Sequence, residues 1–458
     1  MGVDNTLAYI DQGSFLGLRA LGRGPIIQAV WIYDNGVNLD GLRRFRRNLG
    51  RGLFGRRIER SALPFGRHHW VADPAPQTLD LSARERPRDE LWDWADDCLC
   101  APIDPERGPG WRLAVQPLTD GAAAVSLAVS HSIADGHGLV TAVLDAVDGV
   151  DRELGYPRPG SRSRGQALLQ DSRQMVAAVP DIARAVLASV RLARAERADL
   201  ATSFRAAADI PPGDDVPMVP PAVVAFVDTE QWDQCARRLG GTSNSLFSGV
   251  AARLGQLLGR VDGTGQVHLS WPVSERTEGD TRANALVSAE MTADPDEVLT
   301  DLSGVRAAMK KALSESAETS RRMTGPLPLT PLTPRVVLRR LEGMVLAVNN
   351  PIACSNIGEP DPAFSRVDGT DADYVVMRGV EPNITSRVLN RIGGQLLLGG
   401  VRAHGRMALS VTSWSVQPEP LGQPNTKEAL REVVLKALAD FGLTGTVEGP
   451  CAPGPSSR

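Results

Sequence analysis

Two segments rich in proline and glycine, YPRPGSRSR at 156–164 and PPGDDVPMVPP at 211–221, divide this chain. These residue types favour turns and linkers over helices and strands. The 458 residues are also too many for a single hydrophobic core of ordinary size. We therefore expect an N-terminal subdomain at 1–160, a helical connector with linkers at 161–221, a C-terminal subdomain at 222–446 and a disordered tail at 447–458.

The N-terminal part mixes strand-like and helical patterns. PIIQAVWIY at 25–33 is rich in β-branched and aromatic residues and predicts a strand, and VNLDGLRRFRRNL at 37–49 predicts a helix. Two more strands are predicted at 110–118 and 122–130, and a helix follows from about residue 138 to residue 147. This part of the chain is therefore expected to have a mixed α/β structure.

The connector and the C-terminal part continue this mixture. A long helical stretch is predicted at 166–208, with a break near Pro180. A strand and a helix are predicted within 222–240. They are followed by a helix at 243–259, a strand at 266–274, a β-hairpin at 391–414 and an amphipathic helix at 426–442. The two halves share a type of pattern, although their residues show no repeat.

Composition excludes several classes of function. The net charge of −4 and the pI of about 6.0 give no basic field, so we predict no binding to nucleic acid. The five cysteines are scattered and lack zinc-site spacing, so we predict no metal and a reducing, cytoplasmic setting. The first residues do not resemble a secretion signal, and no apolar run reaches the roughly 18 residues of a membrane span.

The most informative short motif is SHSIADG at 130–136, at the end of the predicted strand 122–130. A neutral imidazole at His131 can accept a proton from a hydroxyl or an amine near neutral pH. Asp135 can bind an arginine or a backbone amide and so hold the turn that presents this imidazole. Gly136 allows a bend or a close approach of substrate. The alternative is an ordinary polar turn after a strand.

SHSIADG resembles the HHxxxDG motif of the CoA-dependent acyltransferase superfamily, with Ser130 in place of the first histidine. The pattern is most similar to that of the wax ester synthase/diacylglycerol acyltransferases. Ahead of the motif, Pro109, Gly110 and Trp111 resemble the PLW segment of that family.

Three segments after the motif extend the resemblance, in the order in which the family has them. GGTSNSLFSGV resembles the Asn-Asp stretch, WPVSERTEGDTRANALVS resembles the PVSxR segment with its distant asparagine, and SNIGEP resembles the NVPGP loop. The matching residues are Asn244, Ser274, Arg276, Asn284, Asn356, Gly358 and Pro360, while Ser245 and Glu359 depart from the pattern.

The resemblance implies two chloramphenicol-acetyltransferase-like subdomains that form a pseudodimer around a central cleft or tunnel. His131 would act as general base on an acceptor attacking a thioester, and Asp135 would hold the motif loop through an ion pair. The Gly136 amide, Ser355 and Asn356 are candidates for stabilising the oxyanion. Further candidates for contacts with substrate are Trp111, Asn244, Ser274 and Trp414.

The predicted reaction is acyl transfer from a CoA or carrier-protein thioester to a small-molecule alcohol, in bacterial lipid or specialised metabolism. No cofactor is expected to be permanently bound, because the acyl-CoA or phosphopantetheinyl thioester is the donor substrate. Two alternatives stay open: an amide-forming free-standing condensation enzyme with an amine acceptor, and a catalytically silent, condensation-like scaffold.

Two other features of the sequence have more than one interpretation. The arginines of 43–60 could bind phosphate, a carrier protein or a membrane surface in a peripheral contact, or they could form a solvated face, since Leu42, Phe45 and Leu49 fall on one side of the predicted helix. His137 is expected to face solvent at the start of a helix rather than to take part in catalysis.

Overall fold

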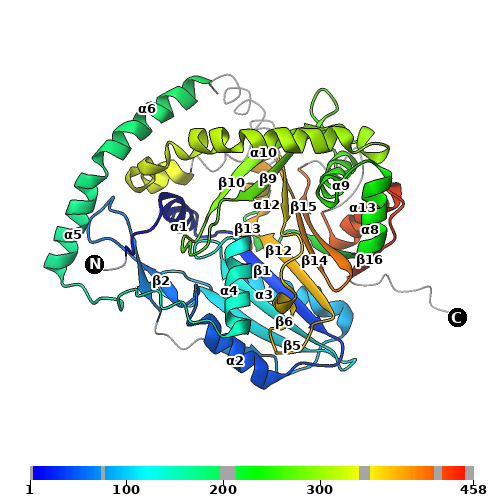
Figure 1. The fold of residues 1–458 in the computed structure, drawn as a ribbon, viewed down its shortest axis with the longest axis horizontal. Coiled ribbons are helices and arrows are strands. Elements are labelled where there is room, and N and C mark those ends of the chain that lie inside the picture. The colour runs from blue at the N-terminus through cyan, green and yellow to red at the C-terminus, as the bar shows by residue number, and fades with distance from the viewer. Residues whose placement is uncertain (1–3, 74–77, 196–212, 340–350, 417–424, 449–458) are drawn as a thin grey trace.

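The computed structural model describes residues 4–73, 78–195, 213–339, 351–416 and 425–448. Two mixed sheets lie side by side, with helices packed around them (Figure 1). The strands of the first sheet, in spatial order, are β12 (Tyr374–Val380), β1 (Ile26–Tyr33), β6 (Ala123–Ser130), β5 (Trp111–Pro117) and β4 (Leu79–Leu81). The strands of the second are β10 (Leu286–Ala293), β9 (Val267–Ser274), β11 (Ile352–Asn356), β14 (Gln395–Ala403), β15 (Arg406–Trp414), β8 (Ala222–Asp228) and β16 (Gly445–Glu448).

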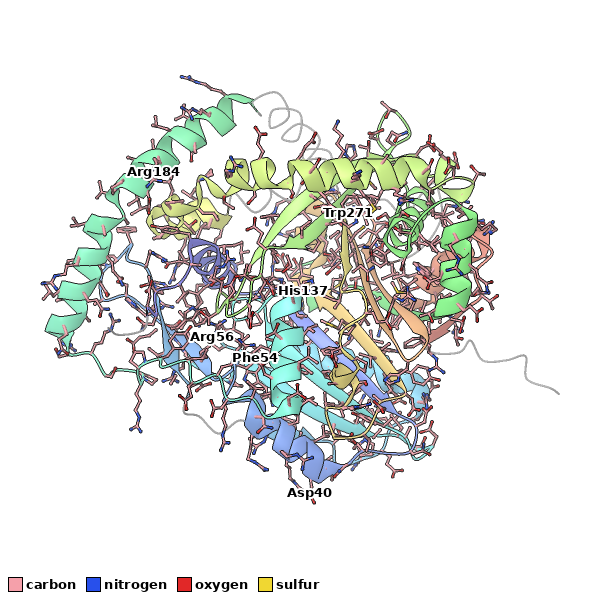
Figure 2. All side chains as sticks on the ribbon, in the orientation of Figure 1. Asp40, Phe54, Arg56, His137, Arg184 and Trp271 are labelled. Atoms are coloured by element: carbon pink, nitrogen blue, oxygen red, sulfur yellow. The ribbon has the colours of Figure 1, made fainter. Side chains whose placement is uncertain are left out.

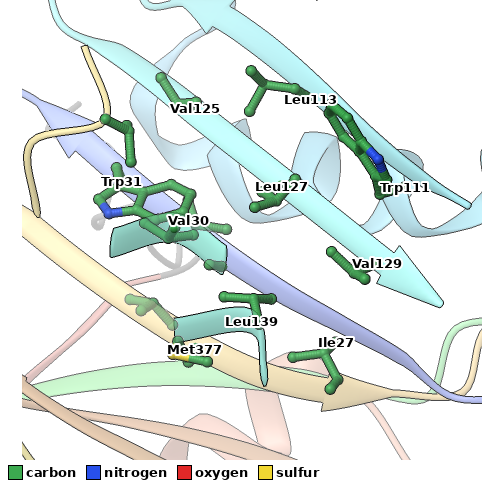
Figure 3. Packing of buried hydrophobic residues seen from close by; sticks show 14 of the residues in the cluster. Ile27, Val30, Trp31, Trp111, Leu113, Val125, Leu127, Val129, Leu139 and Met377 are labelled. Atoms are coloured by element: carbon green, nitrogen blue, oxygen red, sulfur yellow. The ribbon is translucent and has the colours of Figure 1, made fainter. Parts of the chain in front are cut away.

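Helices cover both faces of the first sheet, so every residue of β1 is buried. On one face Gln28 donates a hydrogen bond to the carbonyl of Ala95 in α3 (Leu91–Cys100), at 2.8 Å. On the other, the ring of Trp31 lies 6.5 Å from that of Phe45 in α2 (Leu39–Leu49). Figure 3 shows the apolar side chains of β1, β5, β6 and β12 packing with Leu139 of α4 (Gly136–Asp148). The motif therefore follows a strand that is held in a packed core.

The second sheet carries its own core. Helices α8 (Thr229–Arg238), α9 (Ser243–Leu257) and α13 (Lys427–Asp440) pack on it, and the long α10 (Ser303–Thr324) lies against β10. The remaining elements are α1 (Tyr9–Leu21), α5 (Arg164–Ala177), α6 (Val179–Ala195), α12 (Ser386–Arg391), and the short strand pairs β2 (Arg56–Glu59) with β3 (His69–Ala72) and β7 (Pro217–Met218) with β13 (Ile384–Thr385). Short 3-10 helices lie at Arg88–Glu90, Glu297–Leu299, Leu327–Leu332 and Pro362–Ser365.

Most elements expected from the sequence are present within one or two residues of their predicted bounds. The predicted strand at 25–33 is β1, and the connector helix is broken between Ala177 and Val179 as expected. The predicted hairpin at 391–414 is β14 with β15, but β14 begins only at Gln395, because Arg391 ends the helix α12. The part of the connector helix expected at 196–208 and the tail at 449–458 lie outside the described residues. Strand β16 runs to Glu448, two residues into the predicted tail.

The first sheet crosses the expected boundary between the subdomains. Strand β12, at 374–380, pairs antiparallel with β1 over seven residue pairs, from Ile26 with Val380 to Ile32 with Tyr374. A segment from the predicted C-terminal subdomain thus completes the sheet of the N-terminal one, although the subdomain boundaries themselves stay a prediction. This pairing helps to fix the relative position of the two sheets, because β12 also lies against β14 and β15 of the second sheet, where the hydroxyl of Ser410 donates to the carbonyl of Met377 at 3.1 Å.

Candidate functional site

His131 lies directly beyond the end of β6, where the first sheet meets segments of the second half. Its backbone N–H donates to the carbonyl of Pro25 at 3.1 Å, and the N–H of Ser130 donates to the carbonyl of Gly110 at 3.1 Å. These bonds continue the strand pairing up to the motif, so the backbone that carries the imidazole is fixed on both sides. The His131 side chain is half-buried.

Asp135 caps the helix that follows the motif and also binds the second half of the chain. Its carboxylate, only 2% exposed, accepts from the N–H of Gly138 at 2.6 Å and from the N–H of Ala285 at 2.8 Å. The guanidinium of Arg276 donates to both carboxylate oxygens, at 2.9 and 3.0 Å. This ion pair joins the motif to the loop 275–285 between β9 and β10.

Arg276 also holds its own loop in shape. Its guanidinium donates to the carbonyls of Asp280, Arg282 and Ala283 at 3.0 to 3.2 Å. The loop therefore presents Ala283 and the next residue, Asn284, to the motif in one conformation.

Asn284 connects His131 to a buried carboxylate. Its Oδ1 lies 2.8 Å from Nδ1 of His131, and its Nδ2 donates to Oδ1 of Asp11 at 3.1 Å. Asp11, in α1, is 0% exposed and also accepts from the backbone N–H groups of Ala283 and Asn284. Burial raises the pKa of this carboxyl, whereas the N–H donors and the nearby Arg56 act in the opposite direction.

Arg56 departs from the expectation that the arginines of 43–60 form a solvated face. It is 1% exposed, its guanidinium lies 4.1 Å from the ring of Trp70, and it donates to the carbonyls of Ile133, at 3.0 Å, and Thr281. Burial lowers its pKa. The other prediction for this segment is confirmed, because Leu42, Phe45 and Leu49 are buried. Figure 2 labels Arg56 together with Phe54, which is also buried.

The loop 355–360 packs on the motif from the second half. A Cβ atom at Gly136 would lie 2.9 Å from Cδ1 of Ile357, so a glycine permits this close approach. Asn356 donates to the side-chain oxygen of Asn244 at 2.7 Å and accepts from the N–H of Gly358 at 3.0 Å, so both ends of its amide are occupied. The hydroxyl-bearing Ser355 beside it is exposed.

The remaining candidate residues lie in different surroundings. Ser130 is 4% exposed, and its hydroxyl accepts from the N–H of Ser132. Trp111 is 1% exposed, donates to the carbonyl of Phe54 at 3.0 Å and belongs to the first core. Ser274 is exposed at the end of β9, and its hydroxyl accepts from the N–H of Arg276.

Trp414 packs in a small separate cluster with Ile384, Leu389 and Ile392, and its indole donates to Asn390. His137 is exposed on the first turn of α4, as expected (Figure 2).

Asp11 and Arg56 are the site residues that sequence reasoning missed. Neither belongs to a motif of the resemblance, and both lie far from 130–136 along the chain. The sequence contains only a weak signal for Asp11, which lies one helical turn before Phe15 on the buried face of α1. This helix was not predicted from the sequence.

Comparison with known proteins shows which solved structures have a similar fold. No family model matches the chain, and no curated protein matches it either. Solved structures match over nearly its whole length. TRI101 of F. sporotrichioides, complexed with coenzyme A and T-2, has a TM-score of 0.56 at 10% identity, covering 97% of this chain and 100% of its own. The wax ester synthase/diacylglycerol acyltransferase of Marinobacter aquaeolei VT8 has a TM-score of 0.54 at 16% identity, covering 95% and 98%.

A nonribosomal peptide synthetase, FmoA3 in its α-methyl-L-serine-AMP bound form, matches 96% of this chain at a TM-score of 0.52 and 17% identity. This chain spans only 44% of the FmoA3 chain. Together these likenesses define the fold. It consists of two chloramphenicol-acetyltransferase-like subdomains arranged as a pseudodimer, as in these three proteins.

Proposed function

We propose that this protein is an acyltransferase that moves an acyl group from a CoA or carrier-protein thioester to a hydroxyl group. The observation that carries the proposal is the presentation of His131 at the junction of the two sheets. Its Nδ1 is bound by Asn284, and within the described residues its Nε2 has no hydrogen-bond partner. A half-buried imidazole with one free ring nitrogen, on a backbone fixed from both sides, is suited to general-base catalysis.

In the proposed reaction, Nε2 of His131 takes the proton from the acceptor hydroxyl while the oxygen of that hydroxyl attacks the thioester carbonyl. The tetrahedral intermediate collapses with cleavage of the carbon–sulfur bond, and the leaving thiolate takes the proton from the imidazolium. The products are an ester and a free thiol, and the base is regenerated without a further reactant.

The negative charge on the tetrahedral intermediate requires a hydrogen-bond donor. Of the candidates in loop 355–360, Ser355 is the better one, because its hydroxyl is exposed whereas the amide of Asn356 already bonds Asn244 and Gly358. We therefore assign the oxyanion contact to Ser355, together with the backbone amide of Gly136.

The direct test is release of free thiol from a panel of acyl-CoAs and acyl carrier proteins, with mixed alcohols and amines, by wild type and by His131→Ala. Release that depends on an alcohol and is lost in the variant supports the proposal. Release that depends only on amines supports the amide-forming alternative. Equal release by both proteins contradicts the role of His131, and no release by either folded protein favours the catalytically silent scaffold.

Peripheral contact with a membrane is the second part of the proposal, and the structure favours the α5–α6 arm for it over the arginines of 43–60. The arm runs along the outside of the molecule (Figure 1). Seven of its large apolar side chains are 44% to 72% exposed, and those of each helix fall on one face of that helix: Leu168, Leu169 and Val176 in α5, and Val179, Val186, Leu187 and Val190 in α6.

The charges of the arm suit an anionic lipid surface. It carries five arginines and two aspartates, whereas the whole chain has a net charge of −4. One of the aspartates, Asp171, is 2% exposed and binds His69 and Arg162. An exposed apolar stripe flanked by arginines is typical of helices that lie in a membrane interface. Within the described residues, no helix is both long enough and apolar enough to cross a bilayer.

A further inference from the structure

The amide of Asn284 can have only one orientation in its site. Its Nδ2 donates to Oδ1 of Asp11 and to the backbone carbonyl of His131, both at 3.1 Å, so its two hydrogens are both used. Its oxygen therefore faces Nδ1 of His131, at 2.8 Å. Turning the amide over would place its oxygen against a carboxylate and a carbonyl, neither of which can donate a hydrogen.

This orientation determines where the imidazole carries its hydrogen. Because Oδ1 of Asn284 can only accept, Nδ1 of His131 must donate. A neutral imidazole has a single N–H, so the lone pair available for a proton is on Nε2. When His131 becomes protonated, Nδ1 keeps the same bond, and the carboxylate of Asp11 lies behind the amide on its far side.

We propose that Asp11 and Asn284 are positioning residues that hold His131 in its Nδ1–H form and stabilise the imidazolium that forms during the reaction. The carboxylate that stabilises the protonated base is then that of Asp11, on the first helix, and not that of Asp135 in the motif. This inference rests on the proposed function of His131 as a base.

Asp135 is already fully engaged elsewhere. Its two oxygens accept from Arg276, Gly138 and Ala285, and no hydrogen bond joins its side chain to the imidazole in the described part of the chain. Asp11, by contrast, is connected to the imidazole through a single side chain and is completely buried, where a charge acts over a longer distance than in water.

The charged groups around Asp11 keep it in the acceptor role. Arg56 of β2 and Arg282 of the loop before β10 act on it electrostatically, and the N–H groups of Ala283 and Asn284 point at its two oxygens. These donors favour the ionised carboxylate and so oppose the effect of burial, which raises its pKa.

The first test reads the tautomer directly in the wild-type protein and needs no activity. The protein is labelled with ¹⁵N at histidine, His131→Gln is used to assign the resonances, and the hydrogen on each ring nitrogen is identified by NMR at a pH where the ring is neutral. We expect the hydrogen on Nδ1. A hydrogen on Nε2 overturns the inference, whether or not a substrate has been found.

The second test uses the pH dependence of kcat/KM once a substrate pair is known. Asn284→Ala frees the ring to change tautomer and orientation, and we expect kcat to fall by about 10- to 100-fold with little change in KM, which is less than the loss expected on removing a general base. Asp11→Asn removes the negative charge behind the amide, so we expect the acid limb of the profile to move to lower pH.

Matched controls separate this role from a general loss of packing. Asn48→Ala removes an amide that donates to the carbonyl of Ala146 at 2.8 Å, and Asp368→Asn alters a 1%-exposed carboxylate that accepts backbone N–H groups, both away from the motif. We expect both controls to keep the wild-type pH profile. A folded Asp11→Asn protein with an unchanged profile contradicts the role of Asp11.

Discussion

Asp135 and Arg276 form a buried ion pair, with side chains 2% and 9% exposed, between residues 141 positions apart in the chain. The aspartate belongs to the end of the first sheet and the arginine to a loop of the second half. Since Arg276 also binds three carbonyls of its own loop, the pair positions Asn284 against His131. This one contact therefore contributes both to the placement of the two halves and to the geometry of the proposed base.

We expect Arg276→Met to destabilise the protein by about 3–5 kcal/mol, because it leaves the buried carboxylate of Asp135 without its charged partner. Urea unfolding followed by circular dichroism measures this loss. Arg43→Met, which removes an exposed ion pair with Asp40, is the control and should cost less than about 0.5 kcal/mol. Equal losses in the two variants would show that the buried pair has no special role.

We expect stability to fall as the pH decreases from about 6.5 to about 4, in part because of His68. Burial lowers the pKa of this histidine to about 4. Its Nδ1 accepts from the N–H of Ser61, and its ring packs edge-on against Phe15. The unfolded chain binds a proton in this range and the folded chain does not, so the contribution is fully present above pH 6.5 and is lost towards pH 4. The size is roughly 3 kcal/mol.

The measurement is the free energy of unfolding of wild type and His68→Gln between pH 4 and pH 7.5. Glutamine can still accept from Ser61 but has no ionisable group, so its curve should be flatter. The neighbouring His69 is present in both proteins, and the difference between the curves therefore isolates His68. Parallel curves would contradict the assignment.

We expect opposite effects from alanine at two helical glycines. A Cβ atom at Gly41 in α2 would lie 1.6 Å from the backbone oxygen of Asp368, which cannot move away as a flexible side chain could, so Gly41→Ala should cost at least about 3 kcal/mol. A Cβ atom at Gly17 in α1 meets nothing within 4 Å, so Gly17→Ala should stabilise by about 0.5–1 kcal/mol. Thermal unfolding of both variants tests the local packing.

We expect the intact protein to sediment with vesicles that contain anionic phospholipid, and to do so less with neutral vesicles or at high salt. Val186→Ser with Leu187→Ser on the arm should reduce binding several-fold, and Arg46→Glu with Arg47→Glu in α2 should change it little. A larger loss of binding in the α2 variant than in the arm variant would indicate that the arginines of 43–60 make the membrane contact. Loss of a dimer in the arm variant, without lipid, would instead indicate that a second copy of the chain covers the stripe.

The sequence predicted the strands and helices that show a clear apolar run or a clear helical period. The run 123–130 and the hairpin 395–414 are rich in apolar and β-branched residues, and the breaks at proline and glycine fell where expected. No prediction covered β10, β12, α1, α3 or the long α10. Strand β12 lies between turns, and its partner β1 is more than 340 residues earlier, so local pattern could not assign it to the first sheet.

The site shows the same division. His131, Asp135 and Arg276 could be proposed from the sequence because each lies in a short motif. The polar turn predicted after β6 also placed His131 directly beyond the end of that strand. Trp111 was proposed as a substrate contact, but it is a core residue, because a tryptophan on a buried strand face looks the same in sequence as one that lines a channel.

The sequence by itself determined the local chemistry: the strand that ends in a histidine, the aspartate that caps the next helix, and the glycine that allows the loop 355–360 to approach. Only the tertiary structure decided the partners of these groups. Asp11, Arg56, Arg276 and Asn284 come together because a strand from the second half, β12, completes the first sheet and because the polar loops at this junction are buried. A buried polar group must be hydrogen-bonded to whatever the fold places beside it, and that neighbour is set by packing over hundreds of residues.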